Sequence, residues 1–317
     1  MKLMWRSTEQ FIRRKALAVV FAVLGAIAAS LACLPVGAQS QAAMKQPASE
    51  LQEQSRGKSF ASPEDAAAAL YAAARRNDED MLLMILGPGA KDVIRWSDDP
   101  AVRKAHREEF AQKYDQMHRL VKEPDDTVAL YVGAENWPMP IPLVEYKGAW
   151  YFDAELGKQE IMYRRIGRNE VEALEVCHAL VDAEKEYFGE AHQYTAKFVS
   201  TSGTHDGLYW SAAGGSAKSP IGPYLAHAGV SGSDGGSLEP FHGYYYRILA
   251  GSQAEQGKMT GGFAIVAFPA DYRSSGVMTF LMNQNGDAYE KDLGPQTNTL
   301  AKQISSFNPD STWKKVE

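Results

Sequence analysis

Histidine is the side chain best suited to move protons near neutral pH, so it is the first residue type to search for chemistry. The 317-residue chain has seven: His106, His118, His178, His192, His205, His227 and His242. His205 precedes Asp206 in a glycine-flanked stretch, and His242 precedes a Gly-Tyr-Tyr-Tyr run. Either could serve as a general acid or base if a substrate or nucleophile lay against it. The chain has no Gly-x-Ser-x-Gly elbow, and the sequence predicts no catalytic residue.

Metal binding is the second chemistry that histidines and carboxylates suggest. His106, Glu108 and Glu109 are close in sequence. Successive residues of a helix point in different directions, however, so this run is interpreted as a solvated helix face. No histidine pair has the spacing of a metal site. We therefore predict no metal and no other cofactor.

Aromatic residues form two groups that could bind a ligand. Trp137, Trp150 and Tyr151 fall in the first half of the chain, where they could line a small-molecule pocket. The second group includes Tyr244, Tyr245 and Tyr246, and strand alternation predicts that the outer two share one face. Core packing is the simpler interpretation, whereas exposed aromatic rings would suit a glycan or peptide. The candidate binding residues are Trp137, Trp150, Tyr151, His242, Tyr244 and Tyr246.

The first residues have the layout of a secretory signal. Basic residues up to Lys15 precede an uncharged apolar run over 16–34, and small residues lead to Ala38. We expect a signal peptide over 1–38, cleaved after Ala38, and a periplasmic or secreted protein. One alternative is lipidation of Cys33, which would anchor the chain to a membrane. The other is a retained anchor, because the apolar run is about long enough to span a bilayer.

The charge balance restricts the class of partner. Residues 1–38 contain five of the 33 basic and one of the 39 acidic residues, so the remainder has a net charge of −10. A strongly acidic protein is a poor ligand for nucleic acid, and we predict no nucleic-acid partner. We expect an envelope protein or polymer instead, with no membrane span after processing. Cys177 would be the single cysteine left, and its apolar neighbours predict burial.

The elements fall into two segments of α+β character. Residues 39–60 have almost no large apolar side chains and are predicted to form a disordered tether. The first domain is expected over 61–160, as helices followed by a curved antiparallel sheet. Start and stop signals predict helices over 62–76, 77–86 and 98–121, and β-formers predict strands over 127–132, 140–146 and 150–152.

The second domain is expected over 161–317. A helical pattern over 157–188 leads into it, with loops rich in Gly, Ser and Pro over 200–240. Strands are predicted over 244–249, 262–268, 277–283 and 288–291, the last two joined by the Asn285-Gly286 turn. Residues 297–307 should form a short helix or coil.

Several stretches resemble an exported bacterial family catalogued as domain of unknown function 2950, over nearly all of residues 60–317. The resemblance rests on residues 150–153, 164–170, 242–245, 261–264 and 276–280. It implies export and brings no assigned activity. The first domain also resembles NTF2-like or cystatin-like modules, and the second resembles the globular part of pseudopilins. The polar tether argues against a filament subunit, because a pilin keeps an apolar helix there.

The sequence therefore favours an exported envelope protein with a non-enzymatic binding or assembly-accessory role. One alternative is an envelope hydrolase or other enzyme that uses His242 or His205 with the Gly/Ser-rich loops. Another is a protein with a small-ligand pocket in the first domain.

Overall fold

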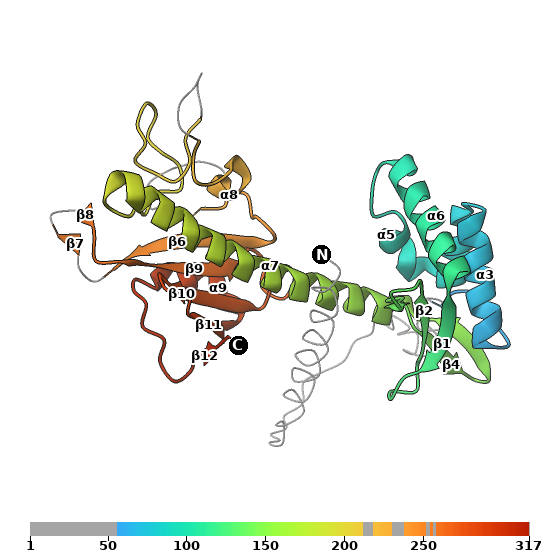
Figure 1. Ribbon diagram of the computed structural model, residues 1–317. Helices are drawn as coiled ribbons and strands as arrows, with labels where there is room; N and C mark the ends of the chain where they lie inside the picture. Colours follow the sequence, from blue (N-terminus) through green and yellow to red (C-terminus); the bar gives the residue numbers. More distant parts are fainter. Residues whose placement is uncertain (1–55, 212–217, 230–237, 252–253, 256–257, 317) are drawn as a thin grey trace, which may run out of the picture. The chain divides into compact units, whose positions relative to one another are not determined.

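The computed structural model describes residues 56–211, 218–229, 238–251, 254–255 and 258–316 (Figure 1). The predicted signal peptide, Cys33, Ala38 and most of the predicted tether lie outside these residues. Within these residues, helices accompany two five-stranded antiparallel sheets and a two-stranded ribbon, which confirms the α+β class. Two compact units divide the chain between Tyr163 and Arg164. They are called here the N-terminal unit, residues 56–163, and the C-terminal unit, residues 164–316.

Helices of the N-terminal unit begin at the caps that the sequence provides. The side chain of Ser62 accepts the N–H of Asp65 at 3.1 Å, and that of Asp78 accepts the N–H of Met81 at 3.0 Å. Asp99 caps a third helix by accepting the N–H of Ala101. The helical elements are α3 (Pro63–Arg75), α4 (Glu79–Leu86), η1 (Pro88–Ala90), α5 (Lys91–Ile94) and α6 (Pro100–Gln116).

The sheet of the N-terminal unit has more strands than predicted. Its strands are β1 (His118–Lys122), β2 (Val128–Val132), β3 (Trp137–Pro138), β4 (Leu143–Tyr146) and β5 (Ala149–Phe152), in the order β1-β2-β4-β5 with β3 on β2. The predicted helix over 98–121 is wrong beyond Gln116. Met117 turns extended, and residues 118–122 pair with β2. The apolar residues there complete the sheet through contacts that helical periodicity does not reveal.

The structure describes residues 56–60, which the sequence places in the tether. Phe60 exchanges both backbone hydrogen bonds with Trp150 at 2.9 Å, and the Lys58 N–H donates to Met84 O at 2.8 Å. Phe60 is buried in the core with α3 and α4. The predicted tether over 39–60 therefore extends too far toward the C-terminus. The buried Phe60 ring and its backbone pairing with Trp150 of β5 hold residues 58–60 in place.

Helix α7 (Ala154–Ala191) is longer than the predicted 157–188. Asp153 accounts for its earlier start, since Oδ1 accepts the N–H groups of Glu155 and Leu156 at 3.0 and 2.9 Å. Within the C-terminal unit, α7 packs its apolar face on the sheet through Cys177, Leu180 and neighbouring residues. None of the helices that the structure describes is long and apolar enough to cross a bilayer.

The C-terminal sheet is covered on both faces. Its order is β12-β11-β10-β9-β6. Along β9, Ile265 and Ala267 face the α7 side, whereas Val266 and Phe268 face the cluster that contains Ala301 of α9. Burial on both faces explains why β9 is apolar throughout rather than alternating. Figure 1 shows α7 crossing this sheet. The elements are β6 (Tyr244–Ala250), β9 (Phe263–Pro269), β10 (Met278–Asn283), β11 (Ala288–Asp292), α9 (Thr297–Gln303) and β12 (Lys314–Lys315).

The predicted Asn-Gly hairpin is confirmed. Asn283 Oδ1 accepts the N–H groups of Asn285 and Asp287, and Gly286 takes a φ of 87°. β10 and β11 pair on either side of the turn. The remaining short elements are α8 (Pro223–His227), η2 (Gly294–Gln296), and the β7 (Ala254–Glu255) and β8 (Lys258–Met259) ribbon.

Candidate functional site

An open groove lies at one end of the N-terminal sheet. The β1–β2 turn, the β4–β5 turn and the start of α3 meet there and enclose a volume of about 600 Å³. This volume falls within the range of small-ligand pockets, roughly 300 to 1,000 Å³. Its lining is mixed in charge and includes one indole ring: Pro63, Lys122, Asp125, Asp126, Thr127, Val128, Val144, Glu145, Lys147 and Trp150.

Some of these charged side chains already bind other residues of the groove. Lys122 Nζ lies 2.8 Å from Asp126 Oδ1, and this contact lowers the pKa of Asp126 and raises that of Lys122. Asp125 Oδ1 accepts the N–H and the hydroxyl of Thr127, which fixes the turn. Glu145 has no ion-pair partner within 4 Å among the described residues. The groove therefore offers the Glu145 carboxylate and the Trp150 ring to a ligand.

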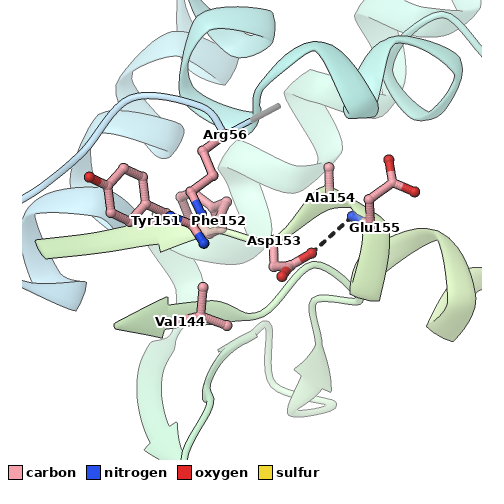
Figure 2. Close-up of a pocket in the computed structure, with 7 residues that line it drawn as sticks. All are labelled: Arg56, Val144, Tyr151, Phe152, Asp153, Ala154 and Glu155. Carbon is pink, nitrogen blue, oxygen red and sulfur yellow. Dashed lines mark hydrogen bonds between the residues drawn. The ribbon is translucent and has the colours of Figure 1, made fainter. Parts of the chain in front are cut away.

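A smaller cavity of about 170 Å³ lies beside β5 and the start of α7. Figure 2 shows its lining residues, with the Arg56 side chain reaching over β5 between Tyr151 and Asp153 in that view. The Arg56 guanidinium carbon is 3.6 Å from the ring centroid of Tyr146 and 5.8 Å from that of Tyr151. The lining residues are Arg56, Val144, Tyr151, Phe152, Asp153, Ala154 and Glu155.

The three aromatic residues predicted to line one pocket are separated. Trp150 lines the groove, Tyr151 lines the smaller cavity, and Trp137 lines neither. Neighbouring residues of a strand point to opposite faces, so Trp150 packs toward the helices while Tyr151 lies under Arg56. Trp137 is half-buried against the core. The predicted common pocket of Trp137, Trp150 and Tyr151 coincides with neither of these two cavities.

His242 forms a dyad with a carboxylate in the C-terminal unit. Its Nδ1 lies 2.8 Å from Glu172 Oε2 on α7, and the two side chains are 40% and 32% exposed. His242 has a φ of 52°, in the left-handed region, and its ring packs edge-on against Phe241. Among the described residues, Nε2 has no hydrogen-bond partner. A carboxylate on Nδ1 orients an imidazole and leaves Nε2 able to exchange a proton with a substrate.

Polar residues of α7 hold the segment around this dyad. Glu170 Oε1 accepts the backbone N–H groups of Val277 and Met278, each at 3.0 Å. Asn169 Nδ2 donates to Ser275 O at 2.8 Å. Stretches 164–170, 242–245 and 276–280, which carry the family resemblance, thus meet in one place. Sequence reasoning missed Glu172, because its pairing with His242 joins segments that are far apart in the sequence.

His205 belongs to a different part of the C-terminal unit. Its carbonyl accepts the Tyr187 hydroxyl at 3.0 Å, and its ring stacks on Trp210 at 4.3 Å. Tyr187 and Glu172, the α7 residues that bind the two histidines, are about 22 Å apart along the helix axis. His205 and His242 therefore lie in different parts of the C-terminal unit. Asp206 next to His205 binds Lys197, whose ammonium group lowers the pKa of that carboxyl.

Tyr244 and Tyr246 lie in the core instead of an exposed groove. Both have no exposed surface and pack against α7, while Tyr245 lies on the opposite face of β6. The predicted alternation is confirmed, and the two residues are removed from the candidate binding surface. The Tyr244 hydroxyl donates to Met278 O at 3.0 Å. Helix α7 covers the face of the C-terminal sheet on which Tyr244 and Tyr246 lie, so both side chains are buried.

Metal ligands and Cys177 are the remaining candidates for a functional site. Among the described residues, no three His, Cys, Asp or Glu side chains are grouped so that they could hold a metal ion. Cys177 is fully buried, and desolvation raises the pKa of its thiol. A buried, protonated thiol is a poor nucleophile, which agrees with its predicted role in packing.

Comparison with known proteins gives one match. The family model described as "Protein of unknown function (DUF2950)" matches residues 57–316, and so covers both units. No curated protein and no solved structure matches the chain. The likenesses to NTF2-like or cystatin-like modules and to pseudopilins therefore stay predictions.

Proposed function

We propose that this chain, which belongs to the DUF2950 family of proteins of unknown function, is exported to the bacterial cell envelope and acts there as a binding module. Export is supported by the basic residues before Lys15, the apolar run over 16–34 and the small residues before Ala38. Cleavage after Ala38 would release a periplasmic or secreted protein. Lipidation of Cys33 is the alternative, and it would anchor the same module to a membrane.

The groove beside Trp150 is the observation that carries the binding role. It is large enough for a sugar or a short peptide segment, and it combines an aromatic ring with carboxylates and lysines. Aromatic rings stack on the apolar faces of sugars and peptides, while charged rims orient their polar groups. An envelope polymer that carries both hydroxyl and amino groups fits this lining. The acidic surface outside the signal segment argues against nucleic acid as the ligand.

Calorimetric titration with soluble fragments of envelope polymer tests this role. Glu145→Lys changes the sign of the charge on the groove without removing core contacts, and we expect it to weaken binding at least tenfold. Glu190→Lys makes the same charge change on an exposed residue near the end of α7 and should bind normally. Equal affinities for the two variants, or no binding by the unmodified protein, would contradict the proposal.

The His242–Glu172 dyad supports a second candidate, an envelope enzyme that uses His242 as a general base. Its geometry suits proton transfer, although none of the described residues supplies a nucleophile against Nε2. His242→Asn removes the imidazole and keeps a residue that tolerates positive φ. If hydrolysis of an envelope substrate is detected, His242→Asn should abolish it without lowering the unfolding temperature. A fall in stability with unchanged turnover would identify His242 as structural.

A further inference from the structure

Arg56 is a cation that pairs with no carboxylate in the part of the chain that the structure describes. Its guanidinium stacks on Tyr146 at 3.6 Å and lies within 6 Å of Tyr151, and among the described residues no acidic oxygen lies within ion-pair distance of it. Stacking on aromatic rings holds the guanidinium plane while its N–H edge stays available. That edge borders the small cavity. An arginine held in this way is suited to a bidentate contact with a carboxylate.

The opposite charge in the cavity comes mainly from Asp153. Its Oδ1 caps α7, but Oδ2 has no hydrogen-bond partner in the part of the chain that the structure describes. Glu155 also lines the cavity, and its Oε1 is paired with Lys158 Nζ at 3.2 Å. The lining of the cavity thus includes one cation and one carboxylate that form no ion pair among the described residues, with Val144 and Tyr151 as apolar walls.

Size restricts the occupant further. The cavity is smaller than the roughly 300 Å³ at which typical ligand pockets begin. A cavity of this size suits a small polar group. An ammonium group, a carboxylate and the carbon between them form such a group. We propose that the Arg56–Asp153 cavity binds a zwitterionic α-amino-acid group, with the carboxylate on Arg56 and the ammonium on Asp153.

The small cavity and the groove share Val144, but Tyr151 and Trp150 lie on opposite faces of β5, and Glu145 does not line the small cavity. Binding here would therefore survive Glu145→Lys. The ligand is either a free small amino acid or a chain end on which an ammonium and a carboxylate share one carbon.

Ligand-observed NMR titration of the full-length protein with glycine, D-alanine and L-alanine tests the proposal. Acetate and methylammonium serve as half-ligands that carry one charge each. We expect at least one amino acid to bind at least tenfold more tightly than either half-ligand. This comparison uses the unmodified protein, so it does not depend on the folding of a variant. Equal binding of acetate and the amino acids, or binding of none, would overturn the proposal.

Two variants locate the site. Arg56→Gln removes the cation, and Asp153→Asn removes the anion while keeping an acceptor that caps α7. Each should weaken amino-acid binding at least tenfold. Arg76→Gln, at an exposed arginine of the same unit, should leave it unchanged. Unchanged affinity in both cavity variants would place the bound amino acid elsewhere and overturn the assignment.

Discussion

Glu184 accepts the backbone N–H of Thr195 through Oε2 at 3.1 Å, while its Oε1 has no hydrogen-bond partner among the described residues. The side chain has no exposed surface and lies on α7 beneath the segment that begins at Thr195. Desolvation by burial raises the pKa of this carboxyl to about 8, although the Thr195 N–H partly offsets the rise. Glu184 is therefore mainly protonated at neutral pH.

This pKa makes stability depend on pH. The folded protein holds the proton more tightly than the unfolded chain, so the stabilisation is complete below pH 4.5 and is lost as pH rises to about 8. At about 1.4 kcal/mol per pKa unit, the loss amounts to a few kcal/mol. Glu184→Gln mimics the protonated acid and should unfold like the natural protein at pH 5 but at a higher temperature at pH 8.5.

The exposed Glu186 on the same helix supplies the control, and Glu186→Gln should change neither unfolding temperature by more than about one degree. Thermal unfolding followed by circular dichroism at the two pH values measures the difference. If Glu184→Gln changes the unfolding temperature equally at both pH values, ionisation of Glu184 does not contribute to the pH dependence of stability.

Loss of the Glu170 carboxylate should weaken the attachment of α7 to β10. Glu170→Ala leaves the N–H groups of Val277 and Met278 without their acceptor, and we expect a cost of about 2 to 4 kcal/mol in the free energy of unfolding. Glu170→Gln keeps an acceptor oxygen and should lose less than half of that. Urea denaturation measures both values. Glu175→Ala, at an exposed α7 position, should stay within about 0.5 kcal/mol of the natural protein.

Arg247 secures the end of α9. Its Nη1 lies within hydrogen-bond distance of the carbonyl oxygens of Ala301, Lys302 and Ile304, at 2.8, 2.9 and 3.2 Å. Arg247→Ala should therefore cost about 2 to 3 kcal/mol and increase hydrogen exchange in α9 first. Lys302→Ala, on the exposed side of α9, should leave exchange there unchanged. Uniform exchange across the C-terminal sheet in Arg247→Ala would indicate a global role instead.

Intact-mass analysis of the protein recovered from a fractionated bacterial host shows how its N-terminal segment is cleaved or modified. We expect a chain that begins at Gln39 in the soluble periplasmic fraction, because small residues precede Ala38. A lipidated Cys33 in the membrane fraction would replace cleavage after Ala38 with lipoprotein processing. Retention of residues 1–38 in the cytoplasm would contradict export altogether.

Several elements could be predicted because their causes lie within a few residues. Ser62 and Asp78 cap the first turns of α3 and α4, and the Asn285-Gly286 turn fixes the hairpin of β10 and β11. Alternation placed Tyr244 and Tyr246 on one face correctly. The same local signals failed at residues 118–122, where pairing with β2 prevails over the helical pattern.

The candidate sites depended on contacts that no local pattern contains. Glu170 binds Val277 from 107 positions away, and the stacking of Arg56 on Tyr146 joins the edge of the predicted tether to β4. The sequence by itself determined the α+β class, the acidic character, the family resemblance and most strand positions, since propensity, capping and periodicity act between near neighbours. Only the tertiary structure decided that His242 pairs with Glu172, that Trp150 and Tyr151 serve separate cavities and that Glu184 is buried, because burial and charge pairing arise when distant segments pack together.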